Sequence, residues 1–138
     1  MTLRVSGLLE GLAQWLHDEG LATYSPTGIY PADGPVISLK TLPSEPAKAV
    51  SLSVYDMGDG LAVPDAEILV QLRFRDGGTR TAVDDFADDV FARLHMRHSF
   101  LAGGIAVSRA RRTSTADLGP DSNNRFERAD NYALAIVR

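Results

Sequence analysis

Apolar residues near the start of the chain recur at the spacing of an α-helix. The apolar stripe consists of Leu8, Leu9, Leu12 and Leu16. It predicts a helix from about Leu3 to Glu19, and Gly20 follows as a residue that readily adopts the left-handed conformation in which many helices end. Gly7 and Gly11 lie four residues apart inside this helix, where each costs about 1 kcal/mol relative to alanine. We therefore expect both glycines to allow close packing against a neighbouring element.

A second helical pattern occupies the segment from residue 81 to residue 98. Its predicted buried stripe consists of Val83, Phe86, Val90, Phe91 and Leu94. Thr81 is placed to cap the start of this helix, and Asp84 follows three residues later, as in a capping box. The sequence therefore predicts a second amphipathic helix in the middle of the chain.

The remaining segments alternate between apolar and polar residues, which is the period of a β-strand. A proline- and glycine-rich crossing contains a short predicted strand at Val36–Leu39, and further strands are expected at residues 50–56 and 68–75. Two more strands are expected after the second helix, within residues 102–112 and at residues 131–137, with a polar loop between them. This order predicts an α+β fold, with a small mixed or mostly antiparallel sheet flanked by two main α-helices.

The length of the chain fits one domain over residues 1–138, because 138 residues can bury a core of their own. No apolar run approaches the roughly 20 residues that span a bilayer, and the first residues lack the layout of a signal peptide, so we expect no membrane association. Cysteine is absent, which excludes disulfides and thiolate chemistry and fits a reducing compartment.

Charge is distributed unevenly along the chain. Residues 1–70 hold three basic and nine acidic side chains, a net charge of −6, whereas residues 71–138 hold eleven arginines and nine acidic side chains, a net charge of +2. The total of −4 disfavours non-specific DNA binding, because phosphate neutralisation needs a basic surface. A polarised chain favours head-to-tail or stacked contacts between copies.

Little in the sequence points to catalysis. The first two turns of the second helix carry Asp84, Asp85, Asp88 and Asp89. Carboxylates of this kind can hold Mg²⁺, but their position opposite the apolar stripe favours a solvated face that complements the helix dipole, with Asp89 spaced to pair with Arg93. His95 and His98 are close enough to share a helix face, yet two ligands fall short of a zinc site. We expect no catalytic residue, no metal and no cofactor, since motifs for a nucleophilic serine or a phosphate loop are also missing.

Arginines gather toward the end of the chain. Arg109, Arg111 and Arg112 mark the end of one predicted strand, and Arg125 and Arg128 follow after the polar loop. Arginine in such numbers fits bidentate contacts with carboxylates or phosphates at an interface. A hairpin whose arginines serve only solubility explains the pattern equally well.

Two longer motifs extend this picture to nearly the whole chain. The first is P-x-x-P-x-x-A-V-x-L-x-x-Y-D, from Pro43 to Asp56, and the second is G-x-D-x-x-x-R-x-E-x-x-x-N-Y, from Gly119 to Tyr132. Between them come the strand "ILVQLRFRDGG" and the acidic helix "VDDFADDVFARLH". In this order the segments resemble the tail terminator (minor capsid) family of long-tailed bacteriophages.

This resemblance implies a structural protein of the virion, assembled in the host cytoplasm, and no enzyme. Members of the family form a ring, usually of six copies, that binds the head-proximal end of the tail tube, stops tube polymerisation and presents a surface to the head–tail connector or neck protein. DNA would pass through the channel without being specifically bound. The residues that we expect at interfaces are Arg109, Arg111, Arg112, Asp121, Arg125, Glu127 and Arg128, with Asp59 and Asp65 in the loop at residues 57–65.

Three other interpretations remain open from the sequence. One is another head–tail connector or neck protein with a similar small fold. Another is a metal-dependent nucleic-acid enzyme that uses the helix carboxylates, and the last is a generic binding module with no connection to a virus. The loops at residues 57–65 and 113–127 are expected to reach a ring axis or an adjoining ring, where they would become ordered on assembly.

Overall fold

The structure, a computed structural model, describes residues 4–30, 33–56 and 67–137. Within them the elements follow in the order α1 (Val5–Asp18), β1 (Val36–Leu39), β2 (Ala49–Asp56), β3 (Glu67–Asp76), α2 (Ala82–Leu94), β4 (His98–Ala102), β5 (Ile105–Pro120) and β6 (Phe126–Ile136). Two helices and six strands in these described residues confirm the predicted α+β class.

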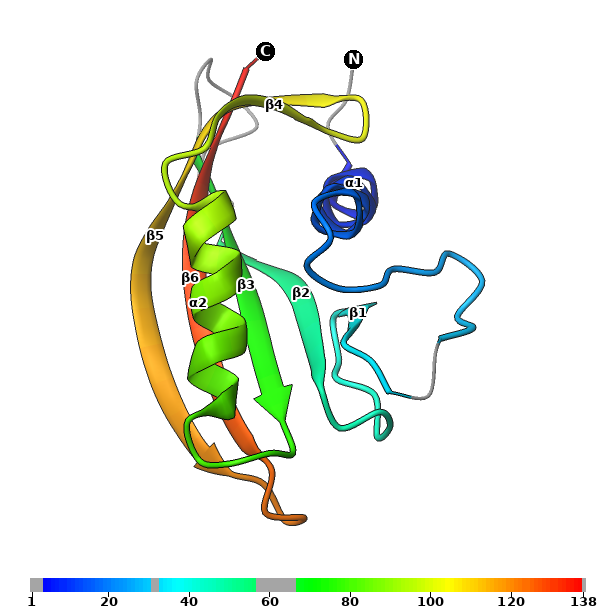
Figure 1. The fold of residues 1–138 in the computed structure, drawn as a ribbon. Helices are drawn as coiled ribbons and strands as arrows, with labels where there is room; N and C mark the ends of the chain where they lie inside the picture. Colours follow the sequence, from blue (N-terminus) through cyan, green and yellow to red (C-terminus); the bar gives the residue numbers. More distant parts are fainter. Residues whose placement is uncertain (1–3, 31–32, 57–66, 138) are drawn as a thin grey trace.

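The strands form one sheet in the order β1-β2-β3-β6-β5-β4 (Figure 1). β1 runs parallel to β2, and every other neighbouring pair is antiparallel, so the sheet is mixed and mostly antiparallel as predicted. α2 packs on β3, β5 and β6, while α1 packs on β1 and β2 and lies under the hairpin of β4 and β5. Residues of both helices belong to one hydrophobic core, which fills the space between the helices and one face of the sheet.

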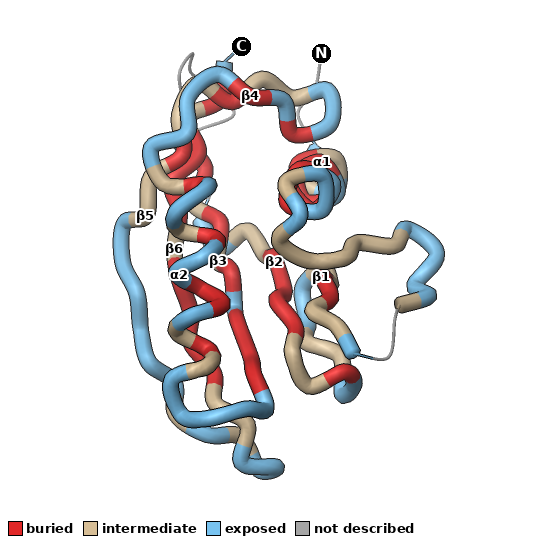
Figure 2. The backbone as a smooth tube through the Cα atoms, in the orientation of Figure 1, coloured by how far each residue is buried: buried red, intermediate tan, exposed pale blue. Residues whose placement is uncertain are grey.

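The amphipathic stripes predicted for the two helices are largely confirmed (Figure 2). In α1 the four leucines are buried, and Trp15 beside them packs on Phe100 of β4 with ring centroids 4.9 Å apart. In α2 the ring of Phe86 meets Phe74 of β3 edge to face at 5.1 Å. Phe91 is only half-buried, because it lies at the side of the helix toward β5.

The two glycines of α1 differ in their surroundings. A Cβ on Gly11 would lie 2.2 Å from the carbonyl carbon of Ala102, so only glycine lets the helix approach the end of β4 this closely. A Cβ on Gly7 would meet nothing within 4 Å. The packing role predicted for both glycines is therefore confirmed for Gly11 and wrong for Gly7, because a side chain on Gly7 would enter open space.

The second helix is shorter than predicted. It ends at Leu94, and Met96, with φ of +62°, turns the chain back so that its backbone N–H donates to the carbonyl of Ala110 in β5. His98 therefore opens strand β4, which the sequence prediction missed, and shares no helix face with His95. The capping box is also wrong, because Thr81 makes no side-chain cap and the Asp84 carboxylate accepts a hydrogen bond from Arg128.

The polar loop predicted between the last two strands is strand for most of its length. β5 continues to Pro120 and pairs with β6 from Phe126 onward, leaving only residues 121–125 as the turn. The polar side chains of β5 misled the prediction because residues 113–118 are exposed on a strand whose outer edge β4 does not reach. β2 is more buried than its alternating sequence predicted. Ser51, expected on an exposed face, is buried, and both faces of the first half of the strand are covered.

Candidate functional site

The residues expected at interfaces fall into four places in the structure. Arg112 and Arg128 lie under α2, Asp121 and Arg125 form the β5–β6 turn, and Arg111 and Glu127 make ion pairs with residues of β3. Arg109 stands apart at the start of β5, and Asp59 and Asp65 lie outside the described residues. The described residues of this nominated set, the residues that the sequence analysis expects at interfaces, therefore lie in three ion-pair clusters, with Arg109 outside them.

The first cluster surrounds a buried carboxylate, that of Asp130 in β6, which is fully inaccessible to solvent. Arg128 donates to both of its oxygens, from Nε at 2.9 Å and from Nη2 at 3.2 Å. Arg112 of β5 lies 3.5 Å away, and the hydroxyl of Thr115 also donates to this carboxylate. Because a buried charge must be paired, this cluster joins β5 to β6 beneath the helix.

Arg128 also ties the sheet to α2. Its Nη1 lies 3.1 Å from Asp84 and its Nη2 lies 3.2 Å from Asp88, one helical turn further on. Burial opposes the charge of Arg128, but its hydrogen bonds and attraction to Asp130, together with those to Asp84 and Asp88, hold its pKa above the ordinary arginine value. The acidic face of α2, predicted to be simply solvated, thus makes ion pairs through two of its four aspartates, and these pairs hold α2 against the sheet.

Two aromatic side chains complete the space under α2. The Arg112 guanidinium stacks 3.9 Å from the centre of the Phe91 ring, which in turn stacks on His95. The backbone N–H of Arg112 donates to Nδ1 of His95, so this nitrogen acts as an acceptor. The hydroxyl of Tyr132 is buried without a hydrogen-bond partner among the described residues, and burial followed by the charge of Asp130 raises its pKa.

The second cluster joins the two motifs that carry the family resemblance. Arg125 of the second motif pairs with Asp121 at 3.0 Å and donates to the carbonyl of Ser44 at 2.8 Å, within the first motif. Arg75 of β3 donates to the carbonyls of Pro43, Pro46 and Ala47. Proline-rich segments lack backbone donors, so arginines that bind their carbonyls fix this one against the end of the sheet.

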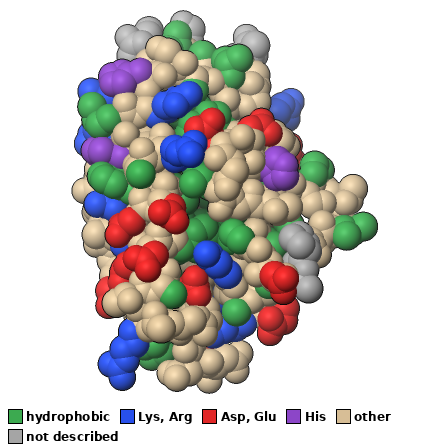
Figure 3. Space-filling view, viewed as in Figure 1, with side chains coloured by type: hydrophobic (Ala, Val, Ile, Leu, Met, Phe, Trp, Pro, Cys, Tyr) green, Lys and Arg blue, Asp and Glu red, His purple; other side chains and the backbone are tan. Residues whose placement is uncertain are grey.

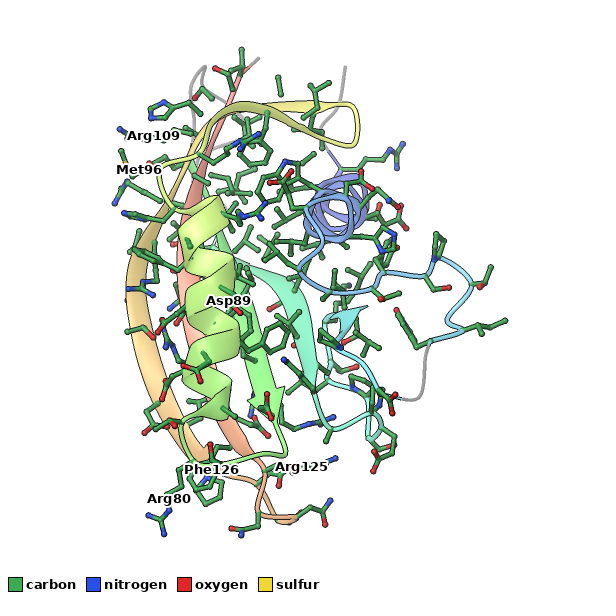
Figure 4. All side chains as sticks on the ribbon, in the orientation of Figure 1. Arg80, Asp89, Met96, Arg109, Arg125 and Phe126 are labelled. Atoms are coloured by element: carbon green, nitrogen blue, oxygen red, sulfur yellow. The ribbon has the colours of Figure 1, made fainter. Side chains whose placement is uncertain are left out.

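Two charged side chains of this second cluster, Asp121 in the turn and Arg75 in β3, have shifted pKa values. Hydrogen bonds from the backbone N–H groups of Arg125 and Asn123 and from the Arg125 side chain hold the pKa of Asp121 below its usual value. Burial, with the nearby charge of Arg125, lowers the pKa of Arg75. The turn, at the lower end of Figure 4, is therefore closed by hydrogen bonds between Arg125 and the Asp121 carboxylate.

The third cluster lies on the face of the sheet away from the helices. Arg73 pairs with Glu127 at 2.6 Å, and Arg111 pairs with Glu67 at 3.2 Å. Between them the Gln71 amide donates to Asn131. These contacts connect β3 with β6 and β5 on the face of the sheet that neither helix covers.

The arrangement offers poor chemistry for catalysis. Among the described residues, no group of three or more His, Asp or Glu side chains is placed to hold a metal ion. Two of the four helix aspartates face an arginine, which opposes a cation at that position. The expected pair between Asp89 and Arg93 is replaced by one between Arg93 and Glu19 of α1, at 3.4 Å. Neither helix of the described part of the chain has the length and apolarity to span a membrane.

A comparison of the sequence with models of protein families identifies the family of this chain. The model of a family described as bacteriophage tail terminator protein matches residues 15–138. The chain belongs to this tail terminator family. No curated protein matches the sequence.

Membership makes the chain a structural protein of the bacteriophage tail and hence a component of the virion. The matched region of this tail terminator begins within α1 and includes all three ion-pair clusters. Sequence reasoning missed Asp130, Thr115 and Arg75, which are central to two of those clusters. A signal for Asp130 was present, because it shares the alternation of Tyr132, Leu134 and Ile136 and so had to point into the core.

Proposed function

We propose that the protein forms a ring of six copies that caps the head-proximal end of the tail tube. The ring ends tube polymerisation and offers its other face to the head–tail connector or neck protein. The family match over residues 15–138 carries this proposal. DNA passes through the channel of the ring without specific recognition, and the ring is built in the host cytoplasm before it becomes part of the neck of the virion.

The distribution of charge supports a role in assembly. Most of the nominated charged residues are held by partners within the chain, so the rigid domain presents preformed surfaces to its neighbours. Figure 3 shows acidic side chains gathered over the lower half of α2, where Asp85 and Asp89 are exposed. An acidic surface of this kind attracts a basic surface on a neighbouring chain and helps to fix the orientation in which the two associate.

The hairpin of β5 and β6 is the element best shaped to reach an adjoining ring. Its outer strand exposes residues 113–118 in succession, and the exposed fraction of Leu118 is 44%. Because Arg125 and Arg128 are occupied inside the domain, contacts from this hairpin fall to the exposed strand and not to those two arginines. An interface role for the nominated residues remains a prediction.

Electron microscopy of phage particles made without this protein tests the proposal. Loss of a terminator leaves overlong tails, because nothing stops tube polymerisation, and leaves heads unattached. Tails of normal length beside unattached heads would instead identify a connector or neck protein. Normal, infectious particles would contradict both functions, and complementation with the wild-type chain is the control.

A further inference from the structure

A groove of about 350 Å³ runs along the outer side of α1. Gly7, Glu10, Gly11 and Gln14 line it from the helix, Tyr24 and Pro26 from the segment that follows, and Gly103 from the β4–β5 turn. The groove exists because Gly11 lets the turn approach the helix backbone, while Gly7 leaves its end open. Three of the groove's lining positions thus lack a side chain, so another chain can come close to the backbone.

The chemistry of this groove suits a cationic side chain with an apolar neighbour. The Glu10 carboxylate has no ion-pair partner among the described residues. Burial, and then the charge of Glu10, raises the pKa of Tyr24, which agrees with the phenol lying close to this carboxylate. Pro26 and the Tyr24 ring supply apolar surface beside the carboxylate. A guanidinium could pair with Glu10 and stack its flat face on the ring.

A matching feature lies on the opposite side of the domain. Arg109 makes no ion pair with another described residue, unlike the rest of the nominated set that the structure describes, and it lies beside Met96, where the chain turns from α2 into β4 (Figure 4). Met96 is 44% exposed, and its backbone N–H is held by the carbonyl of Ala110, so it projects from a fixed position. A thioether packs well on an aromatic ring.

We propose that the α1 groove of one copy receives the Met96–Arg109 corner of a second copy of this chain, with Arg109 pairing with Glu10. The inference rests on the proposed ring and names the contact that builds it. Groove and corner lie on opposite sides of the domain at the same end, with α1 on one side of Figure 1 and β5 on the other. Such a contact is heterologous, so it repeats from copy to copy and can close a ring.

Charge reversal in the full-length chain tests this contact. Sedimentation velocity, alone and with purified tail tubes, should show that Glu10→Arg and Arg109→Glu each weaken association of copies at least about tenfold. Combining both substitutions should restore most of the association, because the pair is re-formed with its charges exchanged. Gly7→Leu, whose Cβ meets no atom within 4 Å, extends a side chain into the groove and should weaken association in the same way.

Arg80→Glu is the matched control, because Arg80 is an exposed arginine without an ion pair among the described residues and lies at the other end of the domain. It should associate as the wild type does. If the wild type forms rings and caps tubes but the Glu10, Arg109 and Gly7 variants do the same, the groove contact is wrong and the proposed function stands. If Arg80→Glu weakens association equally, the effect is general charge and the contact is again wrong. A wild type that neither associates nor caps tubes overturns the proposed function and the contact together.

Discussion

At the scale of single residues, the fold depends on a few buried charges and their partners. Asp130 is inaccessible to solvent and receives hydrogen bonds from two arginines and a threonine. A carboxylate in this setting stabilises the fold only while its partners remain, because each charge left alone in the interior carries a large desolvation cost.

Replacing Asp130 by alanine should therefore destabilise the domain by about 3–5 kcal/mol, since Arg112 would lose its carboxylate partner and the buried Arg128 would keep only the more exposed Asp84 and Asp88. Urea unfolding followed by circular dichroism measures this free energy. Asp89→Ala, on the exposed face of α2, is the control and should change it by less than about 0.5 kcal/mol. Similar losses for the two variants would show that the buried cluster contributes nothing special.

Asp121 gives a pH-dependent prediction at the same scale. Its pKa in the folded protein lies below the ordinary aspartate value of 3.8, so its stabilising effect is complete above that value and is lost as the pH falls through the folded pKa. Asp121→Asn should lower the urea midpoint at pH 7, and the gap to wild type should narrow as the pH falls below about 4. A gap of constant size across this range would mean that the charge of Asp121 has no role.

At the scale of elements, close packing of α1 against β4 decides where the β4–β5 hairpin lies. The helix carries two glycines four residues apart, and only one of them faces the hairpin. The backbone of Ala102 and Gly103 occupies the space that a side chain on Gly11 would need. This contact shapes both the core beneath the hairpin and the groove beside it.

The two glycines give a matched pair of variants. Gly11→Ala should destabilise the domain by about 1–3 kcal/mol, because the new methyl group overlaps the Ala102 carbonyl. Gly7→Ala should stabilise it by about 0.5–1 kcal/mol, because alanine favours the helix and meets no neighbour. Thermal unfolding of both variants measures the difference, and equal shifts would contradict the close approach of α1 to β4.

At the scale of the whole molecule, charge is polarised within one rigid domain. The first half of the chain is acidic and supplies α1, and the arginine-rich second half supplies β5 and β6. Packing joins the two halves through a single core, so the acidic face of α2 and the arginines of β5 and β6 belong to the same body as α1. In the proposed ring, charged contacts between copies are the part of the interface that salt can screen.

Association between copies should therefore weaken as salt is added. Raising the ionic strength from 0.1 M to 1 M shortens the Debye length from about 10 Å to about 3 Å, which screens contacts such as that between Glu10 and Arg109. Light scattering at several protein concentrations should show a smaller mean mass at the higher salt. An unchanged or larger mass would point to an interface held by apolar surface.

The sequence alone determined the helices, five of the six strands in the described residues, the α+β class and the family, because apolar periodicity and local motifs depend only on neighbours along the chain. It could not reveal β4, the length of β5 or the fate of the arginines. Those features depend on residues far apart in sequence. The polar residues of β5 belong to the sheet because they pair with β6, and Arg128 is held in part by Asp84 of α2. Only the tertiary structure decided which charges are paired inside the domain and which, like that of Arg109, make no ion pair with another described residue, because pairing over long sequence distances leaves no local pattern.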